Sequence, residues 1–176
     1  MRRPTDALPE AQEAAVALNA YLKLRGTVQG DILGSVTRAG HEGKIEVIAV
    51  SHALKSPRDV ATGQASGKRE HQALRVTKEI DRATPRLYSA LVRNESLSEG
   101  VLEFFRPGSG GQDDQYYKIE FWNAFVSGID FTMPNNQDPS LVERESFEVV
   151  SFVYQRILWT WTDGTIVAQD DWLAPT

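Results

Sequence analysis

Residues 147–155 read Phe-Glu-Val-Val-Ser-Phe-Val-Tyr-Gln, and this stretch has the period-two pattern of a β-strand with apolar side chains on both faces. The two apolar sets are Phe147, Val149 and Val153 on one side, and Val150, Phe152 and Tyr154 on the other. In an antiparallel sheet one face packs on the core, so the second apolar face needs a separate cover. We expect Val150, Phe152 and Tyr154 to lie at a subunit interface. Cover by a helix or by the N-terminal arm of the same chain is the alternative.

Short strand-like segments begin at Tyr21 and make up most of the chain. They are rich in Val, Ile, Phe, Tyr and Trp and are separated by Gly, Asn, Asp and Pro, which predicts a mainly β fold. Within the segment from residue 117 to 125 the expected buried side chains are Tyr117, Ile119, Phe121 and Phe125. The expected strands cover residues 20–25, 44–51, 72–80, 99–106, 115–125, 126–132, 146–155, 156–162 and 165–169.

One helix is expected to interrupt the strands and to lie against them. Thr84 is a suitable N-cap, Pro85 suits the first turn, and the apolar stripe consists of Leu87, Ala90 and Leu91. A long connection over residues 52–69 is rich in Ser, Gly, Ala and charge and has little that would form a structure of its own. Residues 1–18 are expected to form a short helical or disordered N-terminal extension.

Composition narrows the function. With 176 residues and 41% apolar side chains the chain can form one domain with its own core, and it has no cysteine for a disulfide, a thiolate nucleophile or a zinc site. The net charge of −5 makes nucleic acid an unlikely partner. No apolar run reaches the ~18 residues needed to cross a bilayer. Asp6, Pro9 and Glu10 interrupt the stretch where a signal peptide needs an apolar segment, so we expect no signal peptide.

Nothing in the sequence points to catalysis, a metal or a cofactor. His41, His52 and His71 are scattered without the spacing of metal ligands, and no serine lies in a Gly-x-Ser-x-Gly elbow. The four tryptophans allow a different hypothesis, a carbohydrate-binding β-sandwich, although core packing explains them more simply. We therefore expect a protein that is not an enzyme.

A series of motifs in a fixed order carries a resemblance that covers about residues 19–172. The motifs are Ser66–His71, Val76–Pro85, Phe104–Pro107, Tyr116–Glu120, Met133–Asn135, Val149–Gln155 and Thr160–Gly164. Together they resemble the haemolysin-coregulated (Hcp) family of the bacterial type VI secretion system. The resemblance implies a small antiparallel β-barrel of two packed sheets with one flanking α-helix and a long extended loop. On this basis residues 1–18 are the extension and residues 19–176 are the Hcp-like barrel domain.

The resemblance also implies a function and partners. Hcp proteins form hexameric rings that stack into a hollow tube, which a contractile sheath expels together with spike and effector proteins. The expected partners are further copies of the chain, sheath, spike and baseplate proteins, and effectors in the lumen. The protein would assemble in the bacterial cytoplasm and then reach the extracellular space or a target cell without a signal peptide. A tail-tube protein of a phage-like contractile particle is the alternative within the same architecture.

The resemblance suggests where subunits meet. Residues 53–67 match the family's extended loop, which projects from the barrel and contacts neighbouring subunits or the next ring. In this loop we expect Ser56, Pro57, Arg58 and Asp59 at the interface, in addition to the three apolar residues of the strand at 147–155.

Overall fold

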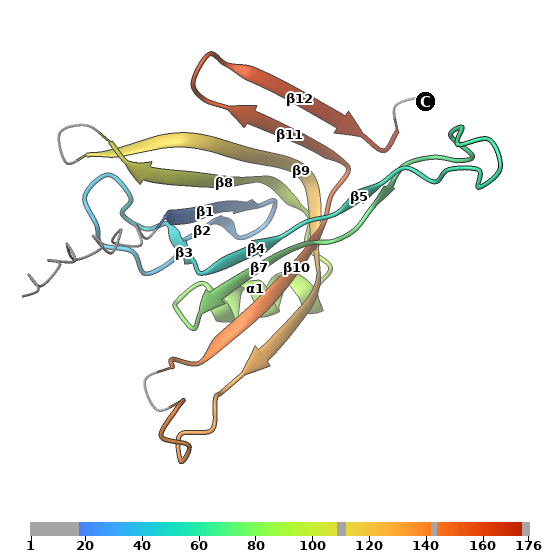
Figure 1. Ribbon diagram of the computed structural model, residues 1–176. Helices are drawn as coiled ribbons and strands as arrows, with labels where there is room; N and C mark the ends of the chain where they lie inside the picture. The colour runs from blue at the N-terminus through green and yellow to red at the C-terminus, as the bar shows by residue number, and fades with distance from the viewer. Residues whose placement is uncertain (1–17, 109–111, 142–143, 174–176) are drawn as a thin grey trace, which may run out of the picture.

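The computed structural model describes residues 18–108, 112–141 and 144–173, and these form a β-barrel with one helix (Figure 1). The predicted N-terminal extension lies outside the described residues except for Leu18. The elements in chain order are β1 (Asn19–Gly26), β2 (Gly30–Ile32), β3 (Ile45–Val47), β4 (Ala49–Ser51), β5 (Leu54–Lys55), β6 (Glu70–His71), β7 (Leu74–Glu79), α1 (Thr84–Val92), β8 (Leu97–Pro107), β9 (Asp113–Thr132), β10 (Phe147–Val153), β11 (Arg156–Trp161) and β12 (Ile166–Asp171).

The barrel is antiparallel and consists of two sheets that share strands at their corners. Around the barrel the neighbours are β1, β8, β9, β10, β7 and β4. β3 and β4 are successive parts of one bent stretch, in which β3 pairs with β1 and β4 pairs with β7, so the stretch closes the barrel. The hairpin β11–β12 extends the first sheet through pairing of β11 with β9. The predicted mainly β barrel of two packed sheets with one flanking helix is confirmed.

β9 is a single long strand that bends from one sheet to the other (Figure 1), where we predicted two strands. At the bend Asn123 has φ 48°, and its side-chain amide donates to Gln155 Oε1 at 3.0 Å. The extra residue shifts the alternation, so Ala124 and Val126 point inward. Phe125 is 40% exposed, and its expected place among the buried residues is therefore wrong.

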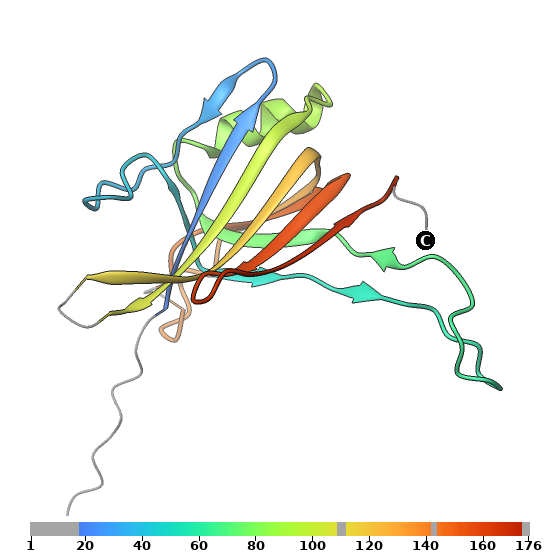
Figure 2. The same cartoon turned by 90° about the horizontal axis from the view of Figure 1, so that it is seen from above.

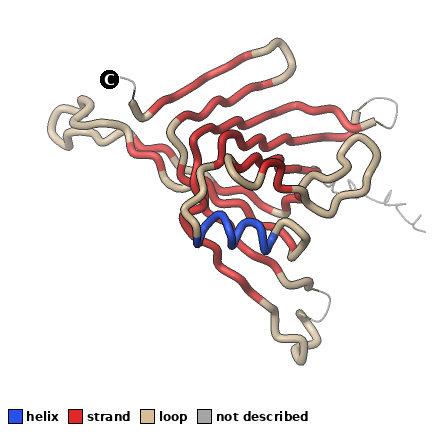
Figure 3. The backbone as a smooth tube through the Cα atoms, turned by 180° about the vertical axis from the view of Figure 1, so that it is seen from behind, coloured by secondary structure: helices blue, strands red, loops and turns tan. Residues whose placement is uncertain are grey.

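The helix α1 covers one end of the barrel with Leu87 and Ala90 buried, as its apolar stripe predicts (Figure 3). It begins one residue earlier than expected: Ala83 is the N-cap, and Thr84 is the first helical residue. Thr84 does not cap the helix because its hydroxyl is engaged by the neighbouring strands, where it donates to Glu148 Oε1 at 2.9 Å. None of the described residues forms a helix that is both long and apolar enough to cross a bilayer.

The long connection after β4 is an ordered hairpin that projects from the barrel (Figure 2). We call residues 52–71 the arm. Near the barrel its two halves pair as β5 and β6, and towards the tip Arg58 and Ala65 form a further β-bridge. The expectation that this segment would form little structure of its own is therefore wrong. The sequence does not indicate this pairing, because the segment is polar and each paired stretch is only one or two residues long.

Candidate assembly surfaces

The sheet that contains β4, β7, β10 and the last part of β9 has two unpaired edges on opposite sides. At one side β4 pairs only with β7. At the other side β9 pairs with β8 as far as Ala124, and its residues 125–132 pair with β10 alone. Among the described residues, no other strand pairs with either of these two edges. Unpaired edges present free backbone N–H and C=O groups, so each edge can accept a strand from another chain.

The outer face of this sheet is made of small, polar and charged side chains with a few apolar ones. Arg75 Nη2 lies 3.8 Å from Asp130 Oδ2 across the face, and both side chains are more than half exposed. Val153 and Phe125 face each other near the bend of β9 and are each 40% exposed. The other residues of the face are Ala49, Ser51, Thr77, Glu79, Ser127, Gly128, Thr132, Phe147, Val149 and Ser151. This face is therefore exposed to solvent and mostly polar.

Val150, Phe152 and Tyr154 lie on the opposite, inner face, and the prediction that they form a subunit interface is wrong. Their side chains are 1%, 0% and 5% exposed within the single chain. Phe152 packs on Phe121 with ring centroids 5.6 Å apart, in the core between the two sheets. Both faces of β10 are apolar in sequence, so the pattern alone did not indicate which face points inward.

The arm brings the four other predicted interface residues together on its outgoing half, where Ser56, Arg58 and Asp59 are exposed and Pro57 is half-buried. Asp59 fixes the tip: its Oδ1 accepts hydrogen bonds from the Ala61 and Thr62 amides at 3.0 and 2.8 Å and from the Thr62 hydroxyl at 2.9 Å. The hydrogen bonds from Thr62 and Ala61 lower the pKa of the Asp59 carboxyl. The role of these four residues at a subunit interface stays a prediction.

The arm also differs in charge from the rest of the chain. From Ala53 to Glu70 it carries four basic and two acidic side chains, a net charge of +2, in a chain whose net charge is −5. Val60 at the tip is fully exposed. A basic arm with an apolar tip is complementary to the acidic body of an identical copy.

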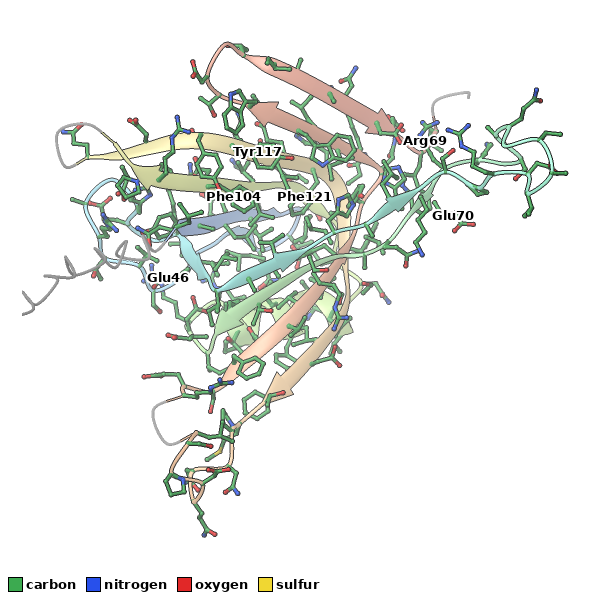
Figure 4. All side chains as sticks on the ribbon, in the orientation of Figure 1. Glu46, Arg69, Glu70, Phe104, Tyr117 and Phe121 are labelled. Atoms are coloured by element: carbon green, nitrogen blue, oxygen red, sulfur yellow. The ribbon has the colours of Figure 1, made fainter. Side chains whose placement is uncertain are left out.

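The root of the arm is joined to the body by a hydrogen-bonded network that sequence reasoning missed. His52 Nε2 and His71 Nδ1 lie 2.6 and 2.8 Å from Tyr154 Oη. His71 Nε2 lies 2.7 Å from Asp170 Oδ2, and Arg69, beside the end of β12 in Figure 4, pairs with the same carboxylate. The two histidines are far from Tyr154 and Asp170 in the sequence, so their spacing does not predict these hydrogen bonds. Among the described residues no group of three His, Cys, Asp or Glu side chains is placed to hold a metal ion.

Comparison with known families gives the identity of this architecture. A family model described as "Type VI secretion system effector, Hcp" matches residues 21–161. The chain belongs to the Hcp family. The "Major exported protein" of Pseudomonas aeruginosa is 32% identical to this Hcp chain over 169 residues, which cover 91% of this chain and 98% of that protein.

Solved Hcp structures have the same fold as this chain. A crystal structure of an Hcp protein superposes with a TM-score of 0.83 at 30% identity, covering 90% of this chain and all of the other. A double mutant of Hcp1 from the E. coli EAEC 042 pathovar gives a TM-score of 0.79 at 33% identity, covering 89% and 99% of the two chains. The Hcp3 protein of Pseudomonas aeruginosa gives 0.73 at 26% identity, over 90% and 100%.

The Hcp motif at Val76–Pro85 has a structural role in this chain. Lys78 is 1% exposed, and its Nζ donates to Glu148 Oε1 at 2.9 Å and to Thr84 Oγ1 at 3.0 Å. The same Nζ lies 2.8 Å from Asp81 Oδ1. The motif therefore fastens the start of helix α1 to the strands β7 and β10 through one buried ammonium group. This explains why Lys, Asp and Thr occur at this spacing in the Hcp chain.

Proposed function

We propose that this Hcp chain is the structural subunit of a type VI secretion inner tube. Six copies form a ring, and rings stack into a hollow conduit that a contractile sheath expels with spike and effector proteins. Baseplate proteins are the expected partners during assembly, and the product is secreted without a signal peptide. The proposal assigns the chain no catalytic residue, cofactor or metal. The Hcp family match supports it, and the two opposite free edges of one sheet are the observation that carries it.

Those edges suit a closed head-to-tail assembly. When β4 of one copy lies beside residues 125–132 of β9 in the next copy, each chain uses two different patches, and such a contact closes into a ring if the rotation permits. Pairing would satisfy the free backbone groups of both edges. The sheets of successive copies then join, and their open, wettable outer faces line one continuous wall. This arrangement suits a conduit better than a contact that buries the outer face against another layer.

The arm supports contact between copies in a second direction. It projects away from the barrel (Figure 2), and its net charge is opposite to that of the chain as a whole. In this proposal Ser56, Pro57, Arg58 and Asp59 contact a neighbouring subunit or the next ring. Opposite charges accelerate the encounter of the copies and fix their orientation more than they add affinity.

Cross-linking tests the edge contact, because the chain has no cysteine of its own. Ser51→Cys places a thiol on β4, and Ser127→Cys places one on the free part of β9. Within one chain the row from Ser51 through Arg75 and Ser151 to Gly128 spans three strand spacings, about 14 Å. A bismaleimide shorter than that span should link the double variant into a ladder that ends at six chains.

Each single-cysteine variant is the matched control and should give no ladder. Electron microscopy of the double variant should show rings, which separates a ring from random aggregation. A ladder without an upper limit would contradict ring closure. If the protein is monomeric at high concentration and no ladder forms, the proposed function is wrong.

A further inference from the structure

The two histidines at the arm root share a single hydroxyl group, and this sharing limits how many protons the root can hold. His52 Nε2 and His71 Nδ1 both lie within hydrogen-bond distance of Tyr154 Oη. Tyr154 is 5% exposed, so water has little access to its hydroxyl. A phenol has one hydrogen to donate and accepts through its lone pairs. The Tyr154 hydroxyl can therefore donate to only one of the two rings at a time.

With both rings neutral every contact can be satisfied. His71 donates from Nε2 to Asp170, which leaves Nδ1 as an acceptor for the Tyr154 hydroxyl. His52 then donates from Nε2 to the oxygen of Tyr154. The chain of hydrogen bonds therefore runs from His52 on the arm to Tyr154 on the body. It returns to His71 on the arm and ends at Asp170 on the body.

One added proton is also accommodated. If His71 becomes an imidazolium, both of its nitrogens donate, one to Asp170 and one to Tyr154, and the Tyr154 hydroxyl turns to donate to a neutral His52. If His52 takes the proton instead, the neutral arrangement of the hydroxyl is kept. Either way no buried hydrogen is left without an acceptor.

A second proton is not accommodated. Both rings would then donate to Tyr154 Oη, and the hydroxyl hydrogen would lose its acceptor in a buried site. The ring centroids are 6.4 Å apart, so two imidazolium charges would also repel each other. The charged or titratable groups around the rings are Arg69 on the arm and Tyr154, Asp170 and Asp171 on the body. Arg69 already uses the Asp170 carboxylate as an ion-pair partner, which leaves less compensation for the histidines.

We propose that His52 and His71 form a proton-operated latch, which holds the arm against the body with at most one added proton and releases it when both rings are protonated. Release separates β6 and the His52 segment from Tyr154 and Asp170, while the barrel stays folded. The consequence for assembly rests on the proposed function: an arm without a fixed direction would no longer meet its neighbour.

The electrostatics sets the direction of the pH dependence. Burial, and next the nearby His71, lower the pKa of His52 in the folded protein. Because the released arm takes up protons more readily, the closed state loses stability as pH falls below about 6.5, the ordinary value for histidine. The loss continues down to the lowered pKa of His52 and then levels off.

A distance measurement between two spin labels tests the latch in the full chain. Val60→Cys labels the exposed tip of the arm, and Val28→Cys labels an exposed turn of the body. The labelled chain is diluted into unlabelled protein, so the measured distance is intramolecular whether or not rings form. We expect one narrow distance at about pH 8 and loss of that narrow distance at about pH 5, across the range in which histidine titrates.

Two further variants make the test specific. His52→Gln keeps a donor and an acceptor for Tyr154 but cannot take a proton, so the narrow distance should persist at the lower pH. His41→Gln is the matched control, because burial and Lys44 also lower the pKa of His41, which stacks on Tyr21 rather than at the arm root. This control should lose the narrow distance as the unmodified labelled chain does. A narrow distance at both pH values in the unmodified labelled chain overturns the latch, and so does a His52→Gln variant that still opens.

Discussion

Two polar networks in this Hcp chain hold two different segments, and they are built in opposite ways. The network at Lys78 and Glu148 is sealed, with side chains 1% and 0% exposed, and it fastens helix α1 to the barrel. The network at the arm root joins two histidine rings through a phenol hydroxyl and a carboxylate, and it lies at the edge of the body. The sealed network joins the helix to the barrel core, whereas the root network joins the projecting arm to the body.

The largest effect is expected from Lys78→Met. The substitution leaves the Glu148 carboxylate buried without its cation, which costs about 3–5 kcal/mol of unfolding free energy. Urea denaturation measures this loss. Lys23→Met is the matched control, because Lys23 is half exposed and Glu103 keeps a second partner in Lys44 at 2.7 Å. The control should lose no more than about 1 kcal/mol. Equal losses would mean that the buried pair has no special role in the fold.

Two adjacent valines on β10 distinguish the inner face from the outer face. Val150 is 1% exposed in the core, whereas Val149 lies on the outer face and is half-buried. Val150→Ala should cost about 1.5–3 kcal/mol of unfolding free energy, and Val149→Ala no more than about 1 kcal/mol. Thermal or urea denaturation of the two single variants checks the difference. If Val149→Ala were the more damaging substitution, the assignment of the two faces would be reversed.

The parts of the fold that follow from local patterns could be predicted from the sequence. The strand texture, the hairpin after Trp161 and the helix after Ala83 depend on residues close together in the chain. The inward face of β10 could not be predicted, because both faces are apolar. The side chains after Asn123 were misplaced because a single left-handed residue shifts the alternation.

The candidate surfaces were predictable only in part. The arm was found through its length and its family resemblance, which placed Ser56, Pro57, Arg58 and Asp59 on it. The root network was not found, because its hydrogen bonds join residues 83 to 102 positions apart and a sequence pattern does not record such contacts. The free edges depend on strand pairing, which is set by the packing of the whole chain.

A smaller and pH-dependent effect is expected at the turn after β1. Burial raises the pKa of the Glu95 carboxyl, but hydrogen bonds from the Gln29 and Val28 amides and from the Gln29 side chain outweigh this and lower it. Because the folded pKa is lowered, this stabilisation is present above the unfolded value of about 4.3 and is lost as pH falls through the folded value.

Glu95→Gln should therefore cost about 1.5 kcal/mol at neutral pH, with a loss that shrinks in acid. Denaturation curves at several pH values measure this, with Glu99→Gln at an exposed position of β8 as the control. A loss independent of pH would show that shape, and not the charge of Glu95, holds the turn. This site also contrasts with the arm root, because its carboxylate responds to pH in a lower range than the histidines do.

The smallest effect on stability is expected at the tip of the arm, where the effect on assembly should be largest. Arg58 is exposed, and none of its hydrogen bonds or ion pairs among the described residues joins the arm to the body. Arg58→Glu should leave the unfolding free energy within about 0.5 kcal/mol. The same substitution cancels the net positive charge of the arm, so association between acidic bodies should weaken, and sedimentation at several salt concentrations can measure this. Arg58→Lys keeps the charge and should preserve both stability and association. An arm that helps to hold the fold would instead make Arg58→Glu destabilising with no separate effect on association, because a segment cannot be dispensable for the barrel and also carry part of its stability.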